Sequence, residues 1–178
     1  MKLKQILLPT LALLIICLAV TAALSVTNHY TKGPIEEQNQ KIITQSMEQL
    51  LPGATFQKQN DTTYLATKDG ATVYVFLTKA MGYKSKVEVM TAVDTNGTVV
   101  GVTVVNCSEE SPGIGQKVGT DKGFSEQFTG KQGLVNTYDA ITGATYSSVA
   151  VKDAVNMALE QFRTVQTVSA TSVQGGAQ

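Results

Sequence analysis

The sequence has few of the residues that build most catalytic and metal sites. It contains two cysteines, Cys17 and Cys107, a single histidine, His29, and no tryptophan. Because Cys17 lies in a long apolar run, the chain cannot form an intramolecular disulfide, a CxxC pair, an iron–sulfur cluster or a haem-attachment motif. A Ser-His-Asp triad or a histidine-based metal site is excluded beyond that run, since His29 stands at its edge. Any redox chemistry must therefore come from a bound cofactor.

The sequence also lacks an excess of either charge. Lys and Arg total 14, Asp and Glu total 14, and the formal net charge is zero. A protein that binds a phosphate backbone needs a clear basic excess, so nucleic acid is excluded as the main partner. With 43% apolar residues the chain has a globular composition, and its 178 residues are enough for one domain of ordinary size.

Residues 6–26 form one long apolar run of 21 residues without a charge. A helix of this length spans about 32 Å, which matches a hydrocarbon core of about 30 Å. A cleaved signal peptide, the competing interpretation, usually has an apolar core of only about 7–15 residues. We therefore expect residues 1–26 to be a retained cell-membrane anchor. Lys2 and Lys4 precede the run, which predicts a cytoplasmic N-terminus and an extracytoplasmic remainder.

Apolar periodicity divides the remaining chain into a helix, a group of strands and a last helix. The predicted strands are residues 62–67, 72–78, 86–94 and 98–106. Gly33-Pro34 is expected to break the chain after the membrane, so that residues 27–53 form a linker and an amphipathic helix. Gly82, ahead of the third strand, indicates a bend or a close backbone approach. Asn96-Gly97 predicts a hairpin turn.

Beyond residue 106 the chain is irregular, except for an amphipathic segment at residues 123–128 and a last helix after residue 142. Residues 54–168 are therefore predicted to form one α+β domain, in which helices pack on an antiparallel sheet, preceded by the transmembrane helix. A flexible tail is expected at residues 169–178. The residues predicted on the buried face of the last helix are Val151, Val155, Ala158, Leu159 and Phe162.

Two short segments carry the residues that could bind a ligand. Residues 139–148 read DAITGATYSS and lead into the last helix, whose N-terminus offers unpaired N–H groups and a positive dipole end to a phosphate. A helix cap rich in hydroxyl groups is the alternative interpretation. Residues 110–115 read ESPGIG, whose glycines would let the backbone approach a flat ligand, with an ordinary surface turn as the alternative. A dinucleotide fingerprint is excluded, because the third glycine of GxGxxG would fall at Val118.

Both segments resemble motifs of the FMN-binding domain family. DAITGATYSS resembles its flavinylation motif D-x-x-S/T-G-A-T-x-S/T, and ESPGIG resembles its loop E-T-P-G-L-G, with Ser for Thr and Ile for Leu. Within this family the chain is most similar to the G subunits of Rnf-type electron-transport complexes. Those subunits are homologous to the C subunit of the sodium-pumping NADH:quinone reductase.

The resemblance implies that FMN is joined to Thr145 by a covalent phosphoester bond, which a separate flavin transferase makes from FAD with a divalent cation. It implies that Asp139 belongs to the transferase-recognition motif, and that Glu110 orients a loop covering part of the flavin ring. Thr142, Ser147 and Ser148 are expected to donate hydrogen bonds to the phosphate. No residue is expected to be catalytic or to bind a metal. The expected cofactor-binding residues are Thr142, Gly143, Ala144, Ser147 and Ser148, with Glu110, Ser111, Pro112, Gly113, Ile114 and Gly115.

In function, the resemblance implies a flavoprotein subunit that relays electrons inside an ion-translocating ferredoxin:NAD⁺ oxidoreductase. The chain would be a redox subunit of this translocase and no complete catalyst, because it has no site for iron–sulfur clusters or nicotinamide. Its partners would be the other membrane and redox subunits and, during maturation, the flavin transferase. A component of a sodium-pumping quinone reductase, a stand-alone extracytoplasmic flavin carrier, and a membrane-tethered ligand-binding or interaction module are the alternatives.

Overall fold

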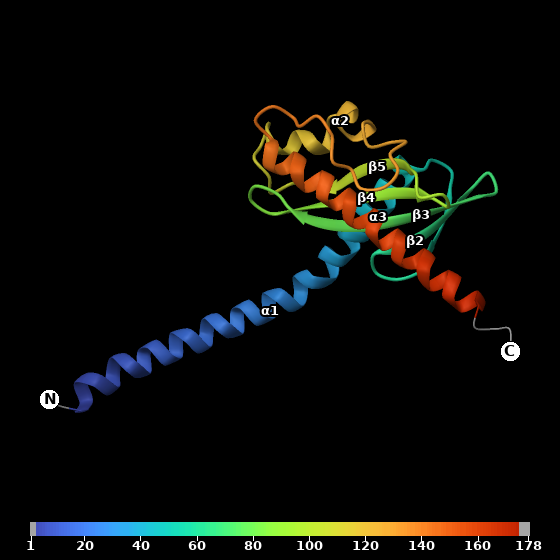
Figure 1. The fold of residues 1–178 in the computed structure, drawn as a ribbon. Helices are drawn as coiled ribbons and strands as arrows, with labels where there is room; N and C mark the ends of the chain where they lie inside the picture. The colour runs from blue at the N-terminus through green and yellow to red at the C-terminus, as the bar shows by residue number, and fades with distance from the viewer. Residues whose placement is uncertain (1–2, 175–178) are drawn as a thin grey trace. The chain divides into compact units, whose positions relative to one another are not determined.

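The computed structural model describes residues 3–174 of the 178-residue chain and divides into two compact units, Met1–Ile42 and Ile43–Gln178. Helix α1 (Leu3–Leu50) supplies the first unit, and its last turns belong to the second (Figure 1). Lys2, on which the predicted orientation partly rests, lies outside the described residues, as does the side chain of Lys4.

The first unit is a helix that contains a long apolar stretch with exposed side chains. Leu11, Leu13 and Leu18 are each more than half exposed. Within the described residues, the segment Pro9–Leu50 contains one stretch that is long and apolar enough to cross a membrane, judged by length and composition. A surface of this kind requires an apolar cover such as lipid tails. The helix therefore has the properties expected of the predicted anchor.

The predicted chain break at Gly33-Pro34 is wrong, because α1 continues through Pro34 to Leu50. A proline inside a helix removes one backbone donor, here the one that would bond the carbonyl of Tyr30. The hydrogen bonds on either side of that position keep the helix continuous. Residues 27–50 are thus helical throughout, and the helix ends before Pro52-Gly53, where the sequence contains its stop signal.

The second unit is built on a five-stranded antiparallel meander in the order β1-β2-β3-β4-β5 (Figure 1). The α+β class with an antiparallel sheet is therefore confirmed, and each predicted strand has a counterpart. Strand β1 is the addition, and its short, mostly exposed sequence carries little apolar pattern. The strands are β1 (Thr55–Lys58), β2 (Thr63–Lys68), β3 (Ala71–Met81), β4 (Lys86–Asp94) and β5 (Val99–Asn106).

The predicted hairpin at Asn96-Gly97 joins β4 to β5. The N–H of Gly97 donates to the carbonyl of Asp94 at 3.1 Å, and Gly97 has φ 82°. The Asp94 carboxylate also accepts hydrogen bonds from the N–H groups of Asn96 at 2.9 Å and Thr98 at 2.8 Å. The loop is a type I turn followed by a left-handed glycine, a usual three-residue hairpin connection.

Both faces of the sheet are covered. Helix α3 (Thr145–Gln174) crosses one face (Figure 1), and its predicted apolar residues are all buried there against strand residues such as Val87 and Val89. On the opposite face Met47 and Leu51 pack with Met90 and Ala92. Each fully buried side chain of this size contributes about 1.5–3 kcal/mol, so strand β4 is held on both of its faces.

Two short helices connect the sheet to α3. They are η1 (Gly115–Gly119) and α2 (Lys122–Glu126), and the Asp121 carboxylate caps α2 by accepting the N–H of Phe124 at 3.1 Å. Phe124 and Phe128 are buried, as the amphipathic pattern predicts. Residues 169–174 belong to α3 and not to a tail, because no glycine or proline interrupts the helix before residue 175. Residues 175–178 lie outside the described part.

Candidate functional site

The structure brings the two predicted motifs together around one cavity, which we call the motif cavity. Its volume is about 340 Å³. Loop residues after β5 meet the approach to α3 there, as the two motifs predict. Two tyrosines, which were not predicted as site residues, complete it. The lining residues are Ser111, Ile114 and Gly115 from the loop, Gly143, Ala144 and Ser147 from the approach and first turn of α3, and Tyr83 and Tyr146.

Thr145 is the first residue of α3, and its side chain is exposed. It lies between Ala144 and Tyr146, which line the motif cavity. The N–H of Ser148 donates to the carbonyl of Ala144 at 2.8 Å, whereas those of Thr145, Tyr146 and Ser147 have no acceptor among the described residues. A 30-residue helix thus presents three unpaired N–H groups and its positive end beside an exposed hydroxyl. This arrangement fits a phosphate ester on Thr145.

The approach to α3 is a tight turn from Ile141 to Ala144. The N–H of Ala144 donates to the carbonyl of Ile141 at 2.9 Å, and Gly143 has φ 79°, which gives the pattern of a type II turn. The Ser148 hydroxyl accepts the N–H of Ile141 at 3.1 Å and is completely buried. Ser148 therefore braces this turn, and because accepting this bond leaves its own hydrogen free, its role as a phosphate donor stays a prediction.

A buried carboxylate, Glu110, joins the β3–β4 turn to the first turn of α3. Its Oε1 accepts the N–H groups of Lys84 at 3.0 Å and Ser85 at 3.1 Å. Its Oε2 accepts the N–H of Tyr83 at 3.0 Å and the Ser147 hydroxyl at 2.5 Å. Glu110 is 1% exposed and does not line the motif cavity, so it acts on the site through its partners.

The same contacts involve Ser147, one of the predicted phosphate donors. A hydroxyl has one hydrogen to donate, and that of Ser147 is donated to Glu110. Ser147 thus lines the motif cavity and links its wall to Glu110. Its role as a phosphate donor stays a prediction.

Glu110 is ionised at neutral pH. Burial raises the pKa of its carboxyl, but hydrogen bonds from the Ser147 hydroxyl and from the N–H groups of Lys84, Tyr83 and Ser85 lower it by more. The pKa consequently lies below its ordinary value, because these donors stabilise the charged form. The carboxylate is a buried negative charge that one hydroxyl and three backbone donors surround.

Two glycines leave room for this carboxylate. A Cβ at Gly82 would lie 2.7 Å from Oε1 and 2.9 Å from Cδ of Glu110. The close approach predicted at Gly82 is thus present, and the approaching group is a side chain. A Cβ at Gly115 would lie 3.0 Å from the Ser147 Oγ and 3.1 Å from the Glu110 Cβ. Gly113 differs from both, since its φ is 73° and nothing lies within 4 Å of the Cβ position.

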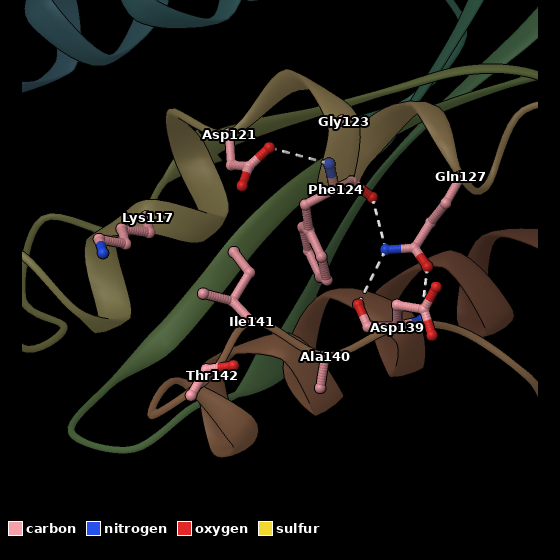
Figure 2. A pocket seen from close by; sticks show the side chains of 9 residues that line it. All are labelled: Lys117, Asp121, Gly123, Phe124, Gln127, Asp139, Ala140, Ile141 and Thr142. Carbon is pink, nitrogen blue, oxygen red and sulfur yellow. Dashed lines mark hydrogen bonds between the residues drawn. The ribbon is translucent and has the colours of Figure 1, made fainter.

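The remaining predicted residues lie outside the motif cavity. Pro112 and Gly113 do not line it, and Thr142 lines a second cavity of about 500 Å³, together with Asp139 and Lys117 (Figure 2). The predicted contact of Thr142 with the phosphate stays a prediction. Neither cavity is lined by Thr145 itself.

Asp139 is held by its backbone. Its N–H donates to the Gln127 Oε1 at 2.7 Å, and the Gln127 Nε2 donates to its carbonyl at 3.1 Å (Figure 2). The residue is exposed, and its carboxylate has no ion-pair or hydrogen-bond partner within residues 3–174.

Cys107 lies apart from the motif cavity and is half-buried. Its thiol donates to the carbonyl of Gln116 at 3.7 Å. Burial raises the pKa of the thiol, which therefore stays protonated at neutral pH. Cys107 thus behaves as a packing residue between β5 and η1.

Comparison with known proteins finds a matching family and individual relatives. The profile of the FMN-binding domain family matches residues 82–160, from Gly82 into α3. The chain is 30% identical to the G subunit of the Na⁺-translocating ferredoxin:NAD⁺ oxidoreductase complex of Acetobacterium woodii, over 86% of this chain and 89% of that one. It is 32% identical to the G subunit of the proton-translocating ferredoxin:NAD⁺ oxidoreductase complex of Clostridium ljungdahlii, over 76% and 80%. A solved structure, the C subunit of the Na⁺-translocating NADH-quinone reductase of Parabacteroides distasonis, is 21% identical with a TM-score of 0.47, over 55% of this chain and 58% of that one.

Proposed function

Since the chain belongs to the family of FMN-binding G subunits of ion-translocating oxidoreductase complexes, we propose that it carries FMN covalently on Thr145 and relays electrons within such a complex. Membership of the family makes it a flavoprotein subunit for electron transfer. The observation that carries the attachment site is the exposed Thr145 hydroxyl beside three unpaired N–H groups at the start of α3. One relative is named as Na⁺-translocating and the other as proton-translocating, so similarity to them does not predict which cation is translocated.

Thr145 is the hydroxyl of this segment best placed for attachment. The Ser147 hydroxyl is bonded to Glu110, Ser148 is completely buried, and Thr142 lies at the second cavity. In the proposed step a flavin transferase acts on FAD: the Thr145 oxygen bonds to the phosphorus of the FMN half, the pyrophosphate P–O bond breaks, and AMP leaves. The hydroxyl proton passes to a base of the transferase. The ester keeps one negative charge, which the N–H groups at the helix start stabilise.

The chain's own residues would hold the cofactor. The start of α3 binds the phosphate, and the small residues Gly115, Gly143 and Ala144 leave the motif cavity open beside it. When bound, FMN supplies the one- and two-electron chemistry that no side chain of this protein provides. Because the chain has only two cysteines, electrons would arrive from and leave to other subunits of the complex.

The proposal includes a membrane orientation. Helix α1 anchors the chain, the N-terminus lies in the cytoplasm, and the FMN-binding domain lies on the extracytoplasmic side. The lysines that precede the apolar run support this orientation. The flavin transferase must then act on the same side of the membrane as the domain.

Mass spectrometry tests the attachment site. The full-length chain is co-expressed with a flavin transferase, and the tryptic peptide of residues 132–152 is analysed after denaturation. The wild-type peptide should carry FMN on Thr145, and Thr145→Ala should carry none while its circular dichroism stays unchanged. Thr145→Ser, which keeps a hydroxyl, and Thr142→Ala should both retain the adduct at a lower level. An unmodified wild-type peptide, or an adduct that persists in Thr145→Ala, would contradict the proposal.

A further inference from the structure

Two exposed tyrosines from distant parts of the chain face each other at the motif cavity. Tyr83 lies in the turn between β3 and β4, and Tyr146 is the second residue of α3. Their ring centroids are 6.2 Å apart and the ring planes are inclined by 41°. The side chains are 62% and 69% exposed, so neither contributes much buried surface to the fold. Exposed aromatic side chains gathered at a cavity are typical of a ligand-binding surface.

A single oxygen atom links the segments that carry the two tyrosines, through a backbone N–H on one side and a side-chain hydroxyl on the other. The Glu110 Oε2 accepts the N–H of Tyr83 at 3.0 Å and the hydroxyl of Ser147, the residue after Tyr146, at 2.5 Å. Glu110 is buried and has two further backbone donors on Oε1. The spacing of the two tyrosines is therefore set by a rigid group below them, and not by contact between their own exposed rings.

The rest of the cavity lining leaves space beside the tyrosines. Gly115, Gly143 and Ala144 present backbone and at most one methyl group to it, and the exposed Ile114 side chain adds an apolar edge. Gly143 cannot be enlarged freely because its φ is 79°. A cavity with aromatic rings on one part of its wall and bare backbone on another fits a flat ring better than a branched or globular ligand.

We propose that Tyr83 and Tyr146 bind the isoalloxazine ring of the FMN by direct ring contact, and that Glu110 is the positioning residue that sets their spacing. The inference rests on the proposed function, since it concerns the flavin carried by Thr145. Contact with a tyrosine has a signature of its own: the phenol ring transfers an electron to the excited flavin, which quenches the emission, and the electron then returns. Phenylalanine keeps the contact but is too poor a donor to quench.

The test measures flavin emission from the full-length, loaded chain in detergent. Emission is divided by the amount of covalent flavin, which is taken from the absorbance of the same sample after denaturation. Tyr83→Phe and Tyr146→Phe should each raise the emission several-fold, and the double variant should raise it most. Tyr138→Phe is the matched control, because Tyr138 stacks on Phe128 and does not line the motif cavity, so its emission should equal that of wild type.

An unchanged emission in the fully loaded double variant would overturn the ring contact while leaving the attachment to Thr145 standing. A wild-type chain without covalent flavin would overturn both. The two failures are thus distinguishable in one set of samples.

The positioning role has a separate test. Glu110→Gln keeps the side-chain size but turns one acceptor oxygen into a donor, so the tyrosines are no longer held and emission and its lifetime should both increase. The exposed neighbour supplies the matched control, Glu109→Gln, which should match wild type. If Glu110→Gln fails to fold, Ser147→Ala removes one donor and should shift the lifetime in the same direction. A folded, loaded variant of either kind with the wild-type lifetime would overturn the positioning role.

Discussion

Substituting Gly82 by alanine should destabilise the domain through a single contact. The added Cβ would lie 2.7 Å from the Glu110 Oε1, 2.9 Å from its Cδ and 3.0 Å from its Oε2. Gly82 does not have a positive φ, so an alanine fits its backbone conformation. The end of a glutamate side chain usually moves aside easily, but this one is held by four hydrogen bonds. The strain must therefore fall on those bonds.

The size of the effect follows from the bonds that the contact disturbs. The Oε1 accepts the N–H groups of Lys84 and Ser85, and a hydrogen bond to a charged acceptor contributes about 1.5–3 kcal/mol. Losing both hydrogen bonds would cost about 3–6 kcal/mol on that scale, and partial relaxation of the turn should preserve roughly half of this energy. We expect Gly82→Ala to lower the free energy of unfolding by about 1.5–3 kcal/mol, a large part of the usual total of about 5–15 kcal/mol.

Urea unfolding of the full-length chain in detergent, followed by tyrosine fluorescence, measures this loss. Gly123→Ala is the control, because its Cβ would make only an ordinary contact of 3.4 Å with Asp121 and alanine favours a helix. Gly123→Ala should be neutral or stabilising by up to about 1 kcal/mol. In a Glu110→Ala background the clash is absent, so Gly82→Ala should cost almost nothing. An equal cost of Gly82→Ala with and without Glu110 would show that the contact with the carboxylate is not the cause of the destabilisation.

Three further results are expected. The lowered pKa of Glu110 contributes stability that is present above its ordinary pKa of 4.5 and is lost as the pH falls through the lower folded value. In urea titrations below pH 4.5, the difference in unfolding free energy between wild type and Glu110→Gln should therefore shrink steadily on acidification. A difference that stays constant would contradict this expectation. Protease added to intact spheroplasts should digest the domain after residue 43, and full protection would reverse the orientation. Asp139→Ala should reduce covalent flavin in denaturing gels while leaving the melting temperature unchanged, since only its backbone is bonded to Gln127; equal loading would remove Asp139 from recognition.

The sequence predicts the fold well where the signal is local. Alternating apolar residues locate β2 to β5, and the spacing in residues 151–162 identifies the buried face of α3, because burial acts on residues close together in the chain. The motifs at residues 110–115 and 139–148 identify the family, and the relatives confirm it. The predicted break at Gly33-Pro34 is wrong because the free-energy cost of a proline is local, and the remaining hydrogen bonds of a long helix outweigh it.

The interior of the site could not be predicted, because its key contacts join segments that are far apart. Glu110 accepts donors 25 to 27 residues earlier in the chain and one 37 residues later. Three of the four are backbone N–H groups, which every residue except proline has, and which leave no trace in the sequence. The sequence offered one signal for these contacts, which was Gly82 ahead of a strand. It predicted a close approach but not that the approaching group is the Glu110 carboxylate.

The packing of Met47 and Leu51 on the sheet limits where the anchor can be removed. These two side chains cover Met90 and Ala92 on the face opposite α3, so the last turn of α1 is part of the domain's interior. A membrane-free fragment that starts at Ile43 retains this cover, whereas one that starts at Ala54 exposes the apolar face and invites aggregation. A protease that releases the flavin domain intact must therefore cut ahead of residue 43. A cut only a few helical turns later would release a domain whose apolar sheet face is exposed.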